Sequence, residues 1–166
     1  MDNGRLRELY LGDQKDRESV YHSKARVDDL SARDRLRREL IYEMMSQGTV
    51  KSPADLYHAA VILQHGSEAR DFLAAHRLAV LSAVGGHRPA RWLLAATLDR
   101  FLVSCSQPQV YGTQFEFDEG ENRYCLRMPI DEASVMPAEK ASLDVPAVGE
   151  RLAQLNSRIH GQGGGA

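Results

Sequence analysis

Apolar residues recur at intervals of three and four positions over most of the first hundred residues, which is the period of one face of an α-helix. Glycine and proline interrupt this pattern often. The loops between the later helices are therefore short, and we expect neighbouring helices to pack antiparallel. The stretch 21–30 is mixed in character and predicts a connection. The pattern predicts helices over residues 4–20, 31–48, 52–66, 68–86 and 89–105.

The boundaries of the central helices carry capping residues. Ser52 stands at the N-cap of the 52–66 helix, Pro53 at its first helical position and Asp55 at its third. Such residues satisfy the free backbone N–H groups at a helix start. We expect Gly66 to end this helix and Ser67 to cap the next one.

After Pro108 the pattern changes from helical spacing to a strand-like composition. Residues 110–117 and 123–128 are rich in aromatic and β-branched side chains and flank the turn-forming stretch DEGEN. This arrangement predicts a β-hairpin near 109–128. A proline-punctuated loop follows, and the stretch AVGERLAQLNSRI (147–159) returns to helical spacing.

Together these elements predict a mainly α protein. We expect a single domain over residues 1–160, built as an antiparallel helical array with a small C-terminal β-hairpin, and a flexible tail at 161–166. A chain of 166 residues suits one domain. It buries roughly 70% of the surface that it exposes when unfolded.

The overall charge is balanced, with 21 basic and 23 acidic residues and a net charge of −2. We therefore expect neither nucleic acid nor an anionic membrane as a partner. No apolar run approaches the roughly 20 residues of a membrane-spanning helix. The N-terminus is charged from its second residue, unlike a signal peptide. Two cysteines without CxxC spacing favour a cytoplasmic protein with reduced thiols. The oligomeric state stays open.

One local cluster of charge stands out in the 31–48 helix. Because arginines alternate there with acidic residues, we interpret the cluster as a solvated helix face and not as a nucleic-acid site. It comprises Arg33, Arg35, Arg37 and Arg38, interleaved with Asp34 and Glu39.

One carboxylate lies in the most apolar helix. Almost every residue of 91–105 is apolar, and Asp99 shares a line with Trp92. An unpaired buried charge costs several kcal/mol, and the neighbouring Arg100 points about 100° away on a helix. We expect a partner on another element, either in a structural ion pair or in a functional site.

Three histidines share helix faces with apolar residues. His58 and His65 are seven residues apart on one helix, and His76 lies on the apolar face of the next. Each is either a core residue with satisfied ring nitrogens or a group for acid–base chemistry, which suits an imidazole with a pKa of about 6.5. The chain lacks HExxH and closely spaced ligands, so we expect no metal site.

The stretch QPQVYGTQF (107–115) places neutral hydrogen-bonding groups beside the apolar helix. Amides and hydroxyls next to a core suit recognition of a polar, uncharged ligand. They equally suit an internal network at a helix-to-strand junction, and both readings stay open. Gly112 permits a bulge or a close backbone approach. The groups in question belong to Gln109, Tyr111, Thr113 and Gln114.

Several stretches, in this order, resemble a family of bacterial proteins of unknown function. The resemblance covers roughly residues 8–155 and brings no known activity. Ser104-Cys105-Ser106 departs from the family, in which a glycine is common before Gln-Pro-Gln. The matching stretches are DQKDR (13–17), HAAVILQHG (58–66), AHRLAVLSAVGG (75–86), LDRFLVSCSQPQVYGTQF (98–115) and PIDEASVMPAEKASLDVPAVGERL (129–152).

The resemblance implies a shared polar pocket, with Arg17 as a partner for Asp99. The positions that it picks out coincide with the polar residues found in apolar places. They are Asp13, Gln14, Arg17, Gln64, His65, His76, Asp99, Arg100, Gln109, Tyr111, Gly112, Thr113 and Gln114.

The first functional hypothesis is a small enzyme without an organic cofactor. His65 or His76 acts as the general acid or base, and Asp99 orients it or tunes its charge. Arg17 or Arg100 binds an anionic group. A hydrolytic or lyase-type reaction on a small polar molecule or a modified peptide fits these groups. Neutral groups of the substrate contact Gln109, Thr113 and Gln114.

The second hypothesis is a non-catalytic binding or adaptor module whose polar cluster is structural. The geometry of the pocket separates the two. An enzyme predicts His65 or His76 in an accessible cleft, with Asp99 within hydrogen-bond reach. An adaptor predicts that these residues are sealed and mutually satisfied, with an exposed apolar patch elsewhere.

Overall fold

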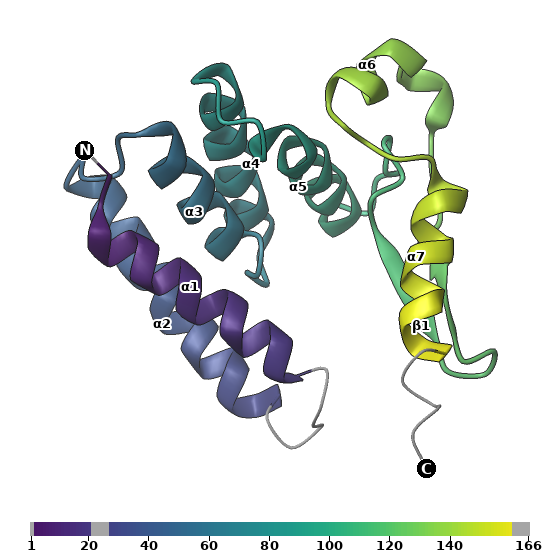
Figure 1. Ribbon diagram of the computed structural model, residues 1–166, viewed down its shortest axis with the longest axis horizontal. Coiled ribbons are helices and arrows are strands. Elements are labelled where there is room, and N and C mark those ends of the chain that lie inside the picture. Colours follow the sequence, from purple (N-terminus) through teal and green to yellow (C-terminus); the bar gives the residue numbers. More distant parts are fainter. Residues whose placement is uncertain (1, 21–26, 161–166) are drawn as a thin grey trace.

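The computed structural model describes residues 2–20 and 27–160, and most of it is an array of antiparallel α-helices (Figure 1). This confirms the predicted mainly α fold with a small β-hairpin near the C-terminus. α3 is the central helix and contacts each of the other four helices of the array. These helices are α1 (Gly4–Val20), α2 (Val27–Ser46), α3 (Pro53–Leu63), α4 (Ala69–Val84) and α5 (Ala90–Ser104).

The core forms around α3 because the second half of this helix is apolar on every side. Every residue from Ala59 to Leu63 is buried. Leu6 of α1, Ile41 of α2 and Leu93 of α5 join the same cluster and are at most 2% exposed. Burying such side chains is the main favourable term in folding, so α3 fixes where the surrounding helices lie.

The start of α3 follows the prediction and its end does not. Ser52 and Asp55 form a capping box, in which the backbone N–H of Asp55 donates to the Ser52 hydroxyl at 3.1 Å. The helix ends at Leu63, so residues 64–66 form a turn beyond it and not its last residues. The predicted cap of the following helix by Ser67 is wrong, because Glu68 occupies the N-cap and makes no side-chain bond there.

Ion pairs join α1 to α2. Asp16 of α1 pairs with Arg33 at 2.9 Å and with Arg37. Arg37 also lies 3.3 Å from Asp34, and its side chain is only 12% exposed. The predicted solvated face is therefore wrong for these residues, which face α1. Arg35 does remain exposed. The predicted connection over 21–30 lies partly outside the described residues, and α2 already begins at Val27.

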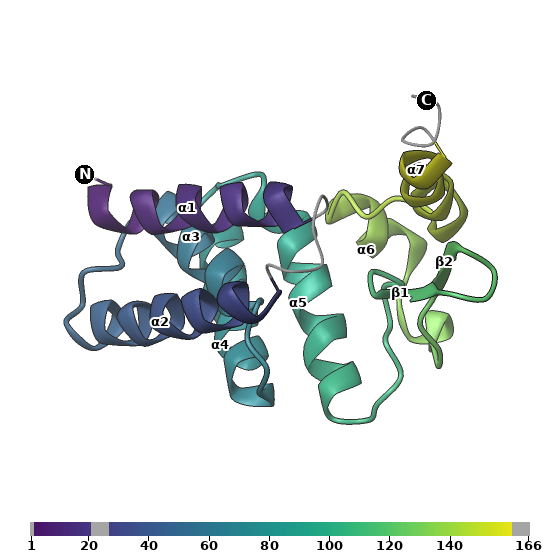
Figure 2. The same ribbon diagram turned by 90° about the horizontal axis from the view of Figure 1, so that it is seen from below.

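The C-terminal part lies beyond α5, on the side away from α1 and α2 (Figure 1, Figure 2). β1 (Phe115–Asp118) and β2 (Arg123–Leu126) pair antiparallel, with Phe117 opposite Tyr124. α7 (Val148–His160) packs on β2, where the Asn156 side chain bonds both backbone groups of Tyr124. The predicted hairpin and last helix are confirmed.

Two segments of this part differ from the prediction. Residues 110–114, expected as strand, form a loop that packs against α5 at Asp99. The expected proline-punctuated loop leads through a 3₁₀ turn, η2 (Glu132–Ser134), into a short helix, α6 (Pro137–Ser142). The predicted flexible tail at 161–166 lies outside the described residues. Across residues 2–20 and 27–160, no helix combines the length and the apolar character needed to cross a membrane.

Candidate functional site

The Asp99 carboxylate organises the loop between α5 and β1, which we call the Asp99 loop (residues 109–114). Asp99 is fully buried. It accepts hydrogen bonds from the backbone N–H groups of Val110 and Tyr111 at 2.8 and 3.0 Å. Thr113 donates its backbone N–H at 2.9 Å and its hydroxyl at 2.8 Å. These donors occupy both carboxylate oxygens, so the predicted contact of Asp99 with a histidine is wrong.

Further contacts seal the Asp99 loop. The fully buried Gln109 accepts the backbone N–H of Gln114 at 2.9 Å and donates to the same residue's carbonyl at 3.1 Å. Gly112 has φ 77°, where side chains are disfavoured, and a Cβ there would lie 2.6 Å from Cγ2 of Val148 in α7. The Tyr111 hydroxyl donates to a carboxylate of α6. The neutral groups of this stretch therefore build an internal network.

Gln114 is the last residue of the Asp99 loop, and its side chain holds Arg100 in position. Its Oε1 accepts from Arg100 Nε at 3.1 Å, and its Nε2 donates to the carbonyl of Ala96 at 3.1 Å. Arg100 Nη1 donates to the backbone carbonyl of Gln64 at 2.7 Å. Adjacent residues on a helix point about 100° apart. Accordingly Asp99 holds the loop, while Arg100 reaches the turn after α3.

The Arg100 guanidinium carries a charge that the described chain does not balance. No carboxylate of the described residues lies within 4.0 Å of it. Burial lowers the pKa of Arg100, and the charge of the nearby Arg17 acts in the same direction. Arg17 itself lies 3.3 Å from Asp13 and 2.5 Å from Asp34. The predicted pairing of Arg17 with Asp99 is therefore wrong.

His65 lies in the turn after α3 and binds a buried carboxylate of α1. Its Nδ1 is 3.0 Å from Oδ1 of the fully buried Asp13. Burial alone would raise the pKa of Asp13, but the hydrogen bond and charge of His65, helped by Arg17 and Gln14, hold it below its ordinary value. An ionised carboxylate only accepts hydrogen bonds, so His65 Nδ1 carries the proton and donates it.

A buried network and a glycine hold this turn in place. Asp71 at the start of α4 accepts the Tyr42 hydroxyl at 2.7 Å and lies 3.4 Å from Arg38 Nε. Arg38 also donates to the backbone carbonyl of His65 at 3.4 Å. A Cβ on Gly66 would lie 2.4 Å from the Asp71 side chain. The turn that carries His65 is thus fixed from α1, α2, α4 and α5.

These groups open onto a cleft of about 450 Å³. Ligand pockets have volumes of about 300–1,000 Å³, so the cleft suits a small molecule. The His65 side chain is 18% exposed, and its Nε2 makes no hydrogen bond within the described chain. Phe72, Val103 and Phe115 supply the apolar part of the wall. The larger polar side chains of the wall belong to Arg17, Gln64, His65, Arg100, Gln114 and Arg127.

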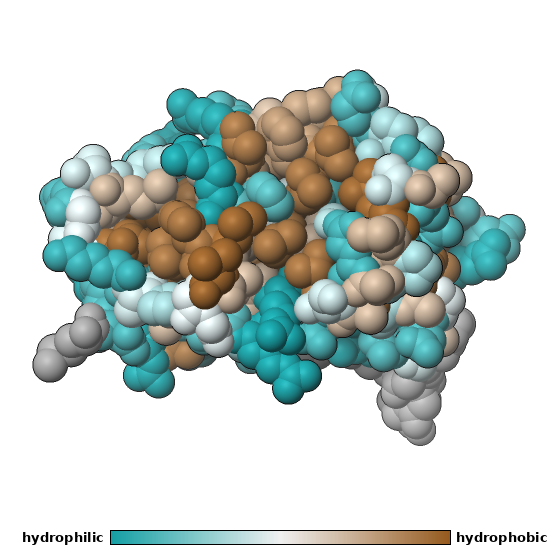
Figure 3. Space-filling model, turned by 90° about the horizontal axis from the view of Figure 1, so that it is seen from above, coloured by the Kyte–Doolittle hydropathy of each residue, from teal (hydrophilic) through white to brown (hydrophobic). Residues whose placement is uncertain are grey.

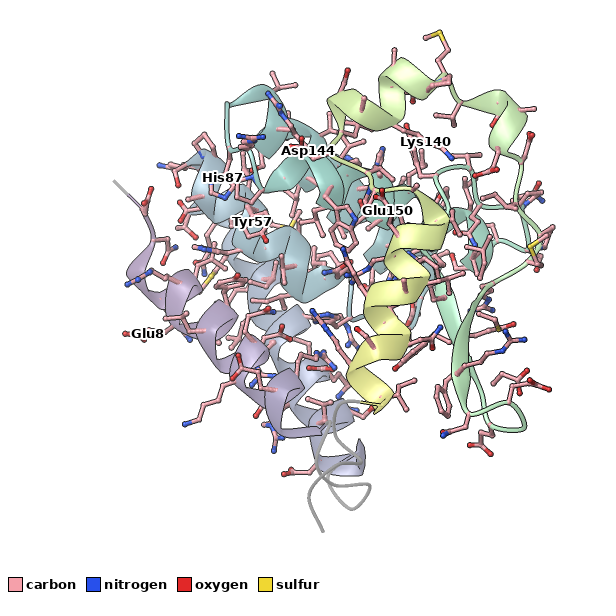
Figure 4. The ribbon with its side chains drawn as sticks, turned by 45° about the vertical axis from the view of Figure 1, so that its right-hand side comes forward. Glu8, Tyr57, His87, Lys140, Asp144 and Glu150 are labelled. Atoms are coloured by element: carbon pink, nitrogen blue, oxygen red, sulfur yellow. The ribbon has the colours of Figure 1, made fainter. Side chains whose placement is uncertain are left out.

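The other two histidines lie away from the cleft. His76 joins α4 to α5, with Nδ1 3.2 Å from the carbonyl of Leu94, and burial lowers its pKa. His58 stacks on Tyr10 with ring centroids 4.3 Å apart, and burial lowers its pKa as well. Beside it, Tyr57 contacts His87 (Figure 4). His76 therefore has the surroundings of a structural residue, whereas Nδ1 of His58 is buried and has no hydrogen-bond partner in the described chain.

Most of the predicted site residues divide between the wall of the cleft and the Asp99 loop, and Gln114 belongs to both. Asp13 and Gln14 lie directly behind the wall, bonded to each other at 2.9 Å. Sequence reasoning missed Arg127, because its place just after β2 follows no pattern. It also missed Asp34, which was assigned to a solvated face although it anchors Arg17. The predicted residues that reach the wall are Arg17, Gln64, His65, Arg100 and Gln114.

Within the described residues, no three His, Cys, Asp or Glu side chains lie close enough to hold a metal ion. Comparisons with protein-family models, with curated proteins and with solved structures found no match.

Proposed function

We propose that this protein is a small enzyme that performs acid–base chemistry on a small molecule with a negatively charged group. The main observation behind this proposal is the 3.0 Å contact between His65 Nδ1 and Asp13, with the imidazole on the wall of the cleft. A carboxylate that accepts from Nδ1 fixes the tautomer and orientation of an imidazole. Asp13 thus takes the role that the sequence assigned to Asp99.

Nε2 is the reactive atom in this proposal. With the proton held on Nδ1, Nε2 keeps its lone pair, and because the His65 side chain lines the cleft, this atom is the one that can accept a proton from water or substrate. The imidazolium that forms is stabilised by the Asp13 carboxylate behind it. The same group then returns the proton to the product. His65 is therefore the general base and acid, and Asp13 is its positioning residue.

The remaining groups of the wall favour water or a substrate carbon as the reaction partner. Ser104 donates its hydroxyl to the carbonyl of Phe101 at 2.7 Å, so it is not paired with His65 as a nucleophile would be. No cysteine belongs to the wall among the described residues. This supports hydrolysis by an activated water, or proton abstraction in a lyase-type reaction.

Recognition of the substrate falls to fewer residues than the sequence suggested. Gln109, Thr113 and Gln114 use their amides and hydroxyl within the protein. Gln64 makes no side-chain hydrogen bond in the described chain and lines the cleft, so its amide is free for a neutral group of the ligand. Arg100 supplies the charge for an anionic group. Because both cysteines are free thiols, we place the activity in the cytoplasm.

The test is turnover in a defined mixture of small metabolites, followed by proton NMR. Wild-type protein is expected to consume one compound or a related set. His65→Gln is expected to lower that rate by about 10²–10⁴-fold, the usual contribution of a general base. Asp13→Asn should lower it too, because an amide can hold the wrong tautomer. His76→Gln, away from the cleft, is the matched control. Equal rates for wild type and His65→Gln, or no turnover, would contradict the proposal.

A second candidate, an adaptor module, is favoured by exposed apolar side chains. Leu73, Leu81 and Val84 lie on one side of α4 and are 41%, 56% and 82% exposed. Apolar side chains also gather across the face shown in Figure 3. Exposed apolar patches often mark contact surfaces. In vivo cross-linking that depends on Leu81 and Val84 but not on His65 would favour this candidate.

A further inference from the structure

We propose that the cleft binds a phosphate group through Arg100, Arg127 and Arg17. This inference deepens the proposed function and rests on the cleft being its ligand site. The phosphate group is either an ester carried by a small molecule or inorganic phosphate, which share the same dianionic chemistry.

The first argument is the charge balance of the wall. Two carboxylates, Asp13 and Asp34, lie against Arg17, and Asp13 also accepts from His65. Arg100 and Arg127 have no carboxylate of the described residues within 4.0 Å. Two guanidinium groups of the wall therefore lack a directly paired carboxylate among the described residues. A dianion balances both, whereas a monocarboxylate leaves one unbalanced.

The second argument is the set of unused N–H groups. Arg100 spends Nε on Gln114 and one bond of Nη1 on Gln64. Nη2 makes no bond in the described chain, so its N–H groups are free to donate to a ligand. Arg17 uses Nη2 on Asp13 and Asp34, and its Nη1 makes no bond in the described chain. Guanidinium groups bind phosphate oxygens through paired N–H donors.

The third argument is the setting of Arg100. Burial and the charge of Arg17 both disfavour its protonated form. A guanidinium nevertheless remains charged in proteins. Asp13 and Asp34 offset the charge of Arg17. No carboxylate of the described residues lies within 4.0 Å of Arg100, so its buried charge is unfavourable without an anion. The bonds from Gln64 and Gln114 keep Arg100 in place despite this repulsion, which is the arrangement of a binding site prepared for negative charge.

The experiment is calorimetric titration of the full chain with sodium phosphate, sulfate or acetate at pH 7.5 and constant ionic strength. Phosphate and sulfate are expected to bind, and acetate is expected to bind at least about 10-fold more weakly, since it balances one charge where they balance two. Glycerol 2-phosphate separates the two sources. If glycerol 2-phosphate binds as tightly as inorganic phosphate, the cleft accepts phosphate esters. If glycerol 2-phosphate does not bind, the cleft is specific for the inorganic ion.

Variants connect the binding to the three arginines. Arg100→Gln should weaken phosphate binding by at least about 10-fold. Because Arg100 also holds two elements together, Arg127→Gln is the second variant. The Arg127 side chain is exposed and makes no bond in the described chain, so its loss leaves the fold intact. Arg91→Gln removes an exposed arginine from the same helix as Arg100 and should bind phosphate as wild type does.

Two results would overturn the inference. One is phosphate binding no tighter than acetate binding. The other is unchanged phosphate affinity in both Arg100→Gln and Arg127→Gln. If acetate binds more tightly than phosphate and Arg100→Gln weakens acetate binding, the phosphate assignment is wrong, but the cleft is still the ligand site. The proposed acid–base function fails separately, through unchanged turnover in His65→Gln.

Discussion

At the scale of single residues, Asp99 and Asp13 show two uses of a buried carboxylate. Asp99 accepts only from the loop that it organises, through backbone N–H groups and one hydroxyl. Asp13 accepts from His65, Arg17 and Gln14, which are side chains on or beside the cleft. A carboxylate held by backbone donors serves the fold, whereas one held by an imidazole can influence proton transfer.

We predict that Asp99→Asn lowers the free energy of unfolding by about 3 kcal/mol, because an amide offers one acceptor oxygen and leaves buried N–H donors unpaired. Urea unfolding of the purified variant measures this. Asp131→Asn, at an exposed position, is the control and should stay within about 0.5 kcal/mol of wild type. A loss for Asp99→Asn as small as that of the control would mean that the Asp99 loop does not depend on the carboxylate.

At the scale of elements, the positions where α3 ends and β1 begins decide which side chains reach the cleft. α3 stops at Leu63, so Gln64, His65 and Gly66 form a turn that contacts four other helices. The Asp99 loop replaces the first half of an expected strand and docks against α7 through Gly112. Each segment contains a glycine that a side chain of another element approaches closely. Gly66 lies against Asp71 of α4, and Gly112 lies against Val148 of α7.

We predict that Gly112→Ala lowers the free energy of unfolding by about 2–4 kcal/mol, from its positive φ and the contact with Val148. Equilibrium unfolding in urea measures this. Gly149→Ala is the matched control on α7, where a Cβ meets nothing within 4 Å. It should be neutral or stabilising by up to about 1 kcal/mol, since alanine favours helix. Adding Val148→Ala to Gly112→Ala should restore part of the loss. Equal effects of the two glycine variants would contradict this account.

The sequence predicts the elements well and the contacts between them poorly. Helical spacing and the Ser52 N-cap place the helices, because these signals are local. The partner of Asp99 could not be found in this way, since its donors are backbone N–H groups of a loop whose shape the carboxylate itself sets. Arg37 appeared solvated because the sequence does not show that α1 lies against it. Polar residues in apolar stretches marked the region of the cleft, but not which carboxylate serves His65.

At the scale of the whole molecule, the cleft exists only when distant segments meet. Arg17 comes from α1, Arg100 from α5 and Arg127 from the position just after β2. His65 comes from the turn after α3, with its carboxylate from α1. Because the helical array and the C-terminal part each supply groups, the proposed chemistry needs the complete fold.

The central claim is that Asp13 holds His65 in one tautomer, with Nε2 free in an open cleft. Long-range ¹H–¹⁵N correlation spectra of the histidine rings at pH 8 test this most directly, with His65→Gln assigning the signals. We expect the pattern of a ring protonated at Nδ1, and loss of that preference in Asp13→Asn, because the ionised carboxylate accepts only from Nδ1–H. A ring protonated at Nε2, or a pattern unchanged in Asp13→Asn, would contradict the account.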